Sequence, residues 1–163
     1  MCIRDSSVAK NITLKKLKNK KLYDHEVTKL SSKIAKKPFV RKALKKFQEN
    51  FIKKSRLVII EGRDIGSKIM PDADLKIFFT CSTNKKARRR LKEFRIIDKK
   101  VTLKQVEKAL IQRDKEDIKR KISPLIMPKN AVLVDTTKLS LKQMEAKLID
   151  LVKTSIKKKY GNI

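Results

Sequence analysis

Glycine is scarce in this sequence, with three residues in 163, and two of them, Gly62 and Gly66, fall within one short stretch. These three positions exclude a phosphate-binding loop of the form G-x-x-x-x-G-K-[ST], which needs two glycines at a fixed spacing before a lysine. The two cysteines lack the spacing of a disulfide framework or a zinc site, so we expect a reduced, cytoplasmic setting. No run of eighteen apolar residues and no signal-peptide pattern occur, so we predict no membrane association.

Aromatic residues are also few, at 5% of the chain, whereas the formal net charge is +28. Of the 45 basic residues, 35 are lysines spread over the whole length and 10 are arginines. Either a lysine-rich solvated surface or a nucleic-acid-binding surface explains the charge, although the latter usually adds aromatic residues or clustered arginine. Either kind of surface would attract nucleic acid non-specifically. Because lysine is the common cation here, the arginines mark places that need a planar group for phosphate or carboxylate.

The length predicts one domain, in which helices alternate with short apolar strands. Residues 1–7 match nothing downstream and are treated as a non-native scar, and residues 12–23 are expected to form an exposed hairpin. Helices are predicted over residues 26–36, 38–54 and 83–94. Two longer helices are predicted to begin at capping boxes. The first begins at Thr102 and Gln105 and extends to about residue 121, and the second begins at Ser140 and Gln143 and extends to about residue 158. Strands are predicted at Leu57–Ile60, Leu75–Thr80 and Ala131–Val134.

This alternation predicts an α/β fold with a parallel sheet and flanking helices. Ligands of such sheets sit at the carboxyl ends of the strands, and all three predicted strands end in polar residues. The first runs into Glu61-Gly-Arg-Asp64, the second ends in Thr80-Cys-Ser82, and the third continues into Asp135-Thr-Thr137. We therefore expect a ligand site at this edge, where Gly62 and Gly66 allow a sharp turn and leave room for the ligand.

The helix that follows Thr102 carries a stripe whose character changes from apolar to charged. Its six members recur at a spacing of three or four residues and share one face. They are Leu103, Val106, Leu110, Arg113, Asp117 and Arg120. Charge on an inward face is costly unless it is paired or meets a ligand. Either the charged half forms ion pairs along an exposed helix, or it lines a cleft suited to a phosphate and a sugar hydroxyl.

A single arginine cluster, Arg88-Arg89-Arg90, lies on the helix after the second predicted strand. It is either a solvated basic face or a group that neutralises phosphate near a strand end.

Five segments, in this order and spacing, resemble the cytidylate kinase family, the bacterial CMP/dCMP kinases of the nucleoside monophosphate kinase group. They are HEVTKLSSKIAKKPFVRKAL, VIIEGRDIGSKIMPDADLKIF, KKARRR, QRDKEDIKRKISPL and VLVDTTKLS. The resemblance extends from about Val8 to the C-terminus. It implies a three-layer sheet of the P-loop NTPase type and a cytoplasmic, monomeric enzyme that transfers a phosphoryl group from ATP with Mg²⁺ to CMP or dCMP.

The resemblance also implies a nucleobase pocket at Ser32, Arg41 and Asp64, with help from Arg120. Cytosine presents acceptors at O2 and N3, which suit Arg or Ser donors. Its N4 amine suits a carboxylate, which would reject the carbonyl of uracil.

The remaining implied roles concern phosphates and sugar. Arg63 and Arg113 match phosphate contacts, and Asp117 matches the contact to the ribose 2′-hydroxyl. Arg89 resembles the lid arginine that closes on the transferring phosphoryl group, with Arg88 and Arg90 beside it on the ATP side. The implied catalytic set is Arg63, Arg89 and Arg113, and no metal ligand is assigned.

One large departure is the missing G-x-x-x-x-G-K-[ST] loop with its preceding strand, which the family has before the equivalent of Val8. The chain is then either a fragment of a longer gene or a natural truncated protein that binds nucleotides without turnover. The resemblance assigns residues 8–54 to the nucleoside monophosphate-binding region and 55–163 to the core, with a lid around 88–121. Because the missing strand would be central, between those at Leu57 and Leu75, we expect the chain alone to be inactive, and unstable or prone to aggregate.

Overall fold

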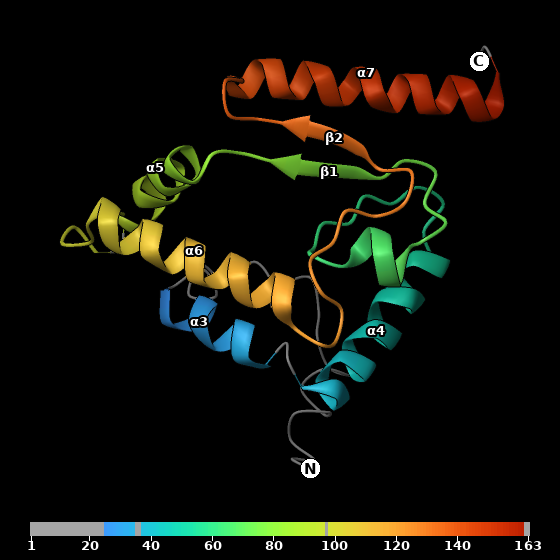
Figure 1. Ribbon diagram of the computed structural model, residues 1–163. Helices are drawn as coiled ribbons and strands as arrows, with labels where there is room; N and C mark the ends of the chain where they lie inside the picture. The colour runs from blue at the N-terminus through green and yellow to red at the C-terminus, as the bar shows by residue number, and fades with distance from the viewer. Residues whose placement is uncertain (1–24, 35–36, 97, 162–163) are drawn as a thin grey trace.

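The computed structural model describes residues 25–34, 37–96 and 98–161, apart from the side chains of residues 25, 26, 28, 29 and 32. The segment 1–7 and the predicted hairpin at 12–23 lie outside the described residues. Within them, the order of elements is that of an α/β protein (Figure 1).

The sheet of the described chain has two parallel strands, β1 (Ile77–Thr80) and β2 (Val132–Asp135). Ile77 pairs with Val132 at one end and Thr80 with Asp135 at the other, so the two carboxyl ends coincide. Both strands are rich in β-branched and aromatic residues, which suit a pleated sheet. The connection between them contains two helices, as a parallel pairing requires (Figure 1).

Those two helices, α5 (Thr83–Phe94) and α6 (Leu103–Lys119), pack against each other. The Ser82 side chain caps α5, and the predicted capping box of Thr102 with Gln105 forms at the start of α6. Between the helices lies an apolar cluster of Ala87, Phe94 and Val106, lined by Leu91, Val101, Leu103 and Leu110. The apolar half of the predicted stripe therefore faces this cluster.

Three further helices are α3 (His25–Ile34), α4 (Pro38–Lys53) and α7 (Leu141–Tyr160). Pro38 stands at the start of α4, where its missing N–H costs nothing. α7 runs along the sheet in Figure 1, and its far end is tied to Asp74 by Ser155 Oγ and Lys159 Nζ. In the described chain, no helix is long and apolar enough to cross a membrane.

The predicted strand at Leu57–Ile60 is wrong. This segment joins neither β1 nor β2, and Leu57 and Ile59 are 87% and 96% exposed. An apolar run becomes a strand only where a neighbouring backbone satisfies its N–H and C=O groups. In the described residues β1 and β2 pair with each other, and no strand pairs with Leu57–Ile60.

The glycines after this segment have a different purpose from the expected one. A short π-helix, η2 (Ile65–Ile69), follows directly and is closed by the Met70 amide donating to Ile65 O at 2.7 Å. A Cβ on Gly62 would lie 2.7 Å from Cγ1 of Ile65, and one on Gly66 would lie 2.9 Å from Cγ of Pro128. Close packing of neighbouring side chains is therefore enough to explain both glycines.

Candidate functional site

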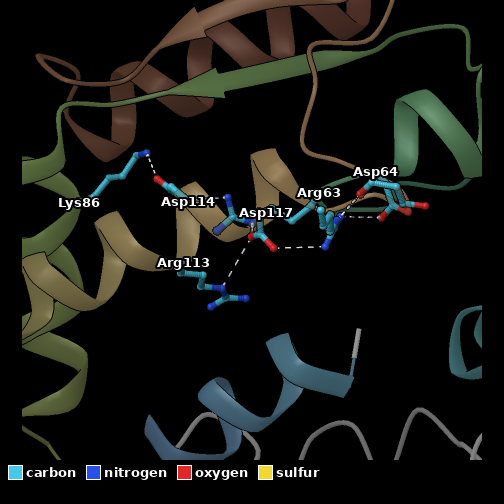
Figure 2. A network of polar contacts seen from close by, with 8 residues as sticks. Arg63, Asp64, Lys86, Arg113, Asp114 and Asp117 are labelled. Carbon is cyan, nitrogen blue, oxygen red and sulfur yellow. Dashed lines mark hydrogen bonds and ion pairs between the residues drawn. The ribbon is translucent and has the colours of Figure 1, made fainter. Parts of the chain in front are cut away.

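Eight charged side chains meet where α6 passes the start of α5, the loop before η2, and α4 (Figure 2). We call this group the charged cluster. Its members are Arg41, Arg63, Asp64, Lys86, Arg113, Asp114, Asp117 and Arg120. Six of them were predicted as substrate-binding residues, and the structure brings these six together.

Asp64 forms one end of the charged cluster. Arg41 Nη1, from α4, donates to Asp64 Oδ2 at 2.6 Å, and Arg120 Nη2 lies 4.0 Å from Asp64 Oδ1. All three side chains are largely buried, with exposed fractions between 6% and 19%. The carboxylate predicted to read the nucleobase is therefore shielded from water and flanked by the two arginines predicted beside it.

Asp117 forms the centre of the charged cluster and is 6% exposed. Arg120 Nη1 donates to its Oδ1 at 3.2 Å, while Arg63 Nε and Arg113 Nε lie 3.2 Å and 4.0 Å from its Oδ2. The first interpretation of the stripe, ion pairs along the helix, is met in part, and the second, a cleft for a ligand, stays a prediction. Ion pairs do run along α6, but they lie on a buried face and extend to residues of another segment.

Several polar atoms in this buried centre have no hydrogen bond among the described residues. They are Arg113 Nε, Asp117 Oδ2 and Arg120 Nη2. Burial lowers the pKa of both arginines, and the nearest like charges, Arg63 for Arg113 and Arg41 for Arg120, lower it further. Both remain charged, because guanidinium does not lose its proton in proteins. Buried polar atoms of this kind are normally paired, and their partner can be a ligand, a water molecule or a part of the chain outside the described residues.

Two members of the charged cluster, Lys86 and Asp114, were not predicted as site residues. Asp114 accepts hydrogen bonds from Arg63 at 3.1 Å and from Lys86 at 3.0 Å. It lies four residues after Leu110 and three before Asp117, so the spacing of the stripe fits Asp114 as well as Arg113. That spacing, and its place in the segment QRDKEDIKRKISPL, were the signals that could have marked it.

The carboxyl ends of two strands, instead of the predicted three, meet at one edge of the sheet. Thr136 Oγ1 donates to Thr80 O at 3.1 Å, which ties the ends of β1 and β2 together. Arg89, from α5, donates to Thr136 O at 3.0 Å and to Leu139 O at 3.3 Å. Arg63 and Asp64 contact α4 and α6 instead, because Leu57–Ile60 does not join the sheet and cannot deliver them to this edge.

The other predicted arginines make their contacts outside the charged cluster. Arg88 Nε donates to Asn84 on its own helix, and Arg90 pairs with Glu93 and stacks over Phe94. The arginine triplet therefore points in three directions. Ser32 belongs to α3, but its side chain lies outside the described residues.

The charges of the cluster favour an anionic ligand. Among the described residues, five cationic side chains face three carboxylates, which leaves two positive charges in excess there. A phosphate monoester at neutral pH carries between about 1.5 and 2 negative charges. The mixed donors and acceptors around it are also able to bind polar groups of a sugar or a base.

Comparison with known proteins gives one consistent result. The chain matches the cytidylate kinase family over residues 5–154. It is similar to a cytidylate kinase of Thermosipho africanus (strain TCF52B), 44% identical over 115 residues, which are 69% of this chain and 50% of that protein.

Two further relatives carry the same name. The cytidylate kinase of Rickettsia canadensis (strain McKiel) is 38% identical over 136 residues, which are 83% of this chain and 62% of that protein. That of Thermotoga maritima is 39% identical over 123 residues, which are 76% of this chain and 56% of that protein. The chain thus spans 50% to 62% of the length of these relatives.

Proposed function

Because this chain belongs to the cytidylate kinase family, we propose that the charged cluster binds the acceptor nucleotide of a phosphoryl transfer, CMP or dCMP. The proposal is carried by one observation. Among the described residues, a partly buried cluster holds five cations and three carboxylates, together with buried polar atoms that have no hydrogen bond there. A nucleoside monophosphate supplies the phosphate charge and the hydroxyl groups that such a cluster needs.

Each part of the cluster has a role in this proposal. Asp64 accepts a hydrogen bond from the N4 amine of cytosine, and Arg41 and Arg120 donate hydrogen bonds to the base. Arg63 and Arg113 bind the phosphate, where their forked donors match its oxygens. Asp117 accepts a hydrogen bond from a ribose hydroxyl. Ser32 completes the base pocket in the family pattern, a role that stays a prediction.

The donor side of the reaction is proposed from the family alone. ATP is the phosphoryl donor, Mg²⁺ enters with it as part of that substrate, and Arg89, with Arg88 and Arg90 beside it, acts on the ATP side. In the described residues no group of His, Cys, Asp and Glu is arranged to hold a metal ion, so no resident metal site is assigned.

The remaining expectations from the sequence stay predictions too. They are the nucleotide-binding region at 8–54, the lid around 88–121, a monomeric state for the family's enzyme as distinct from the chain alone, a cytoplasmic location and only non-specific attraction to nucleic acid. The sequence contains no G-x-x-x-x-G-K-[ST] loop, so ligand binding is a more direct test than turnover.

Titration calorimetry on the 163-residue chain tests the proposal. We expect CMP to bind at least about tenfold more tightly than UMP or cytidine, because UMP lacks the N4 amine and cytidine lacks the phosphate. A basic nucleic-acid-binding protein would instead bind RNA with an affinity that falls steeply with salt, and would show no preference for CMP. Equal affinities for the three ligands would contradict the proposed function.

Replacing Asp64 by Asn tests the base pocket. The amide adds a donor that suits the O4 carbonyl of uracil, so we expect the preference for CMP over UMP to fall by about tenfold or more. Asp72→Asn is the matched control, since Asp72 is an exposed aspartate in the following turn. If the preference survives unchanged in Asp64→Asn, the assignment of Asp64 to the base is wrong.

A further inference from the structure

Asp114 lies between two cations that come from distant parts of the chain. Its Oδ1 accepts a hydrogen bond from Arg63 Nη1 at 3.1 Å, and its Oδ2 accepts one from Lys86 Nζ at 3.0 Å. Arg63 precedes η2, Lys86 is on α5 and Asp114 is on α6, so one carboxylate joins three segments (Figure 2). Each of its oxygens serves a different cation.

These contacts define the orientation of Arg63. Its Nη1 is held by Asp114, and its Nε lies 3.2 Å from Asp117 Oδ2, so the planar guanidinium is fixed at two of its nitrogens. The side chain is 36% exposed and would otherwise have much of the rotamer freedom of a surface arginine. Among the described residues, Nη2 donates no hydrogen bond. That nitrogen therefore has no partner in the described part of the chain that would compete with a ligand.

An ordinary surface ion pair is the alternative for Asp114, and such pairs contribute little. Two observations argue against it. The Asp114 side chain is only 27% exposed, and both of its oxygens are engaged. Burial alone would raise the pKa of Asp114, but the hydrogen bond and charge of Lys86, followed by those of Arg63, outweigh burial and lower it. The carboxylate is thus held in its charged form by the two residues that it joins.

We propose that Asp114, supported by Lys86, is a positioning residue that orients the guanidinium of Arg63 toward the phosphate of the acceptor nucleotide. The inference rests on the proposed function, because it takes Arg63 as a phosphate contact. Asp114 itself touches no substrate. It acts through Arg63, and Lys86 keeps its second oxygen from turning away.

The variant Asp114→Asn tests this role with little change of shape. Its amide replaces one acceptor oxygen by a donor, so contact with one of the two cations becomes donor against donor. We expect the affinity for CMP to fall about tenfold, while that for cytidine, which has no phosphate, changes less than about twofold. Lys86→Met should act in the same direction by about threefold.

Glu107→Gln is the control, because it removes one negative charge from α6 and Glu107 takes part in no ion pair or hydrogen bond among the described residues. Both affinities should stay within about twofold of wild type. In an Arg63→Gln background, Asp114→Asn should cause no further loss of CMP affinity, since there is no guanidinium left to orient.

The outcomes separate the two proposals. An unchanged CMP affinity in Asp114→Asn, equal losses for CMP and cytidine, or a full additional loss in the Arg63→Gln background would overturn the positioning role. In each of these cases wild-type preference for CMP leaves the proposed function standing. A wild-type chain that binds CMP no better than cytidine would overturn the proposed function, and the positioning role with it.

Discussion

Asp117 shows how a single buried carboxylate organises its surroundings. It is the most buried of the three acids in the charged cluster, and it contacts arginines on both sides along α6 and one from the loop before η2. Arg120 beside it is equally shielded, with 6% of its side chain exposed. The stability of this region therefore depends on charge balance, since a buried cation without a partner is expensive.

We expect Asp117→Asn to lower the free energy of unfolding by about 3 kcal/mol, because it leaves Arg113 and Arg120 without their shared carboxylate. Urea denaturation followed by circular dichroism measures this change. Glu107→Gln serves again as the control on the same helix and should shift the free energy by less than about 0.5 kcal/mol. A similar, small effect for both variants would show that the charged cluster does not need this carboxylate for stability.

The contacts of Asp114 predict that the free energy of unfolding depends on pH, with a sign set by the neighbouring cations. Its pKa lies below the ordinary 3.8, so its stabilising effect is complete above that value and is lost as the pH falls through the lower folded-state pKa. We expect wild type to exceed Asp114→Asn in unfolding free energy at about pH 6, and the difference to shrink toward about pH 3. Urea titrations of both proteins across this range measure it. A difference that stays constant or grows on acidification would contradict the pKa shift.

At the scale of elements, local sequence signals fix the helices that carry the site. The side chains of Thr102 and Ser140 both accept a hydrogen bond from the backbone amide three residues on, and the side-chain oxygen of the glutamine at that position accepts one from the backbone amide of the cap residue. These signals need no distant partner. They place α6, and with it the face that holds Arg113 and Asp117.

Thr102→Ala should therefore lower the free energy of unfolding by about 1 kcal/mol, since the first turn of α6 loses the acceptor for one of its unpaired amides. Thermal and urea unfolding measure the change. Thr154→Ala is a fair comparison, because Thr154 is exposed within α7 and alanine favours helix there. If Thr102→Ala is as harmless as Thr154→Ala, the capping box adds nothing to stability.

At the scale of the whole molecule, the described chain buries few apolar side chains. Five are buried, namely Ile65, Ala87, Phe94, Val106 and Val134. Large apolar residues are exposed instead, including Leu57 at 87%, Ile59 at 96% and Leu133 at 54%. Exposed apolar surface of this kind favours association. The structure thus gives a physical basis for the expected tendency of the isolated chain to aggregate.

We expect sedimentation velocity of the 163-residue chain to show association that increases with concentration. Replacing Leu57 and Ile59 together by lysine should reduce it, because these two side chains are almost fully exposed in an unpaired segment. Ile126→Lys adds a charge at another exposed isoleucine and should reduce it less. A wild-type chain that sediments as a monomer at all concentrations, with cooperative thermal unfolding, would refute the expectation.

The sequence by itself determined the features that depend on neighbours along the chain. It placed α5, α6 and α7 through their caps, predicted β1 and β2 to within two residues at either end, and marked the stripe that brings Asp117 to a buried face. The five sequence segments, in their order along the chain, also indicated the family that the comparisons found. These signals are short-range or cumulative, so they can be read without coordinates.

Only the tertiary structure decided the features that depend on partners far away. Leu57–Ile60 reads as a strand but has no described strand beside it, because pairing depends on another segment's backbone. Arg89 turns to Thr136, 47 residues away, and Asp114 joins Arg63 and Lys86, 51 and 28 residues away. No periodicity encodes such separations. The charge of each residue was visible in the sequence, whereas its partner was set by how α5, α6 and the loop before η2 pack.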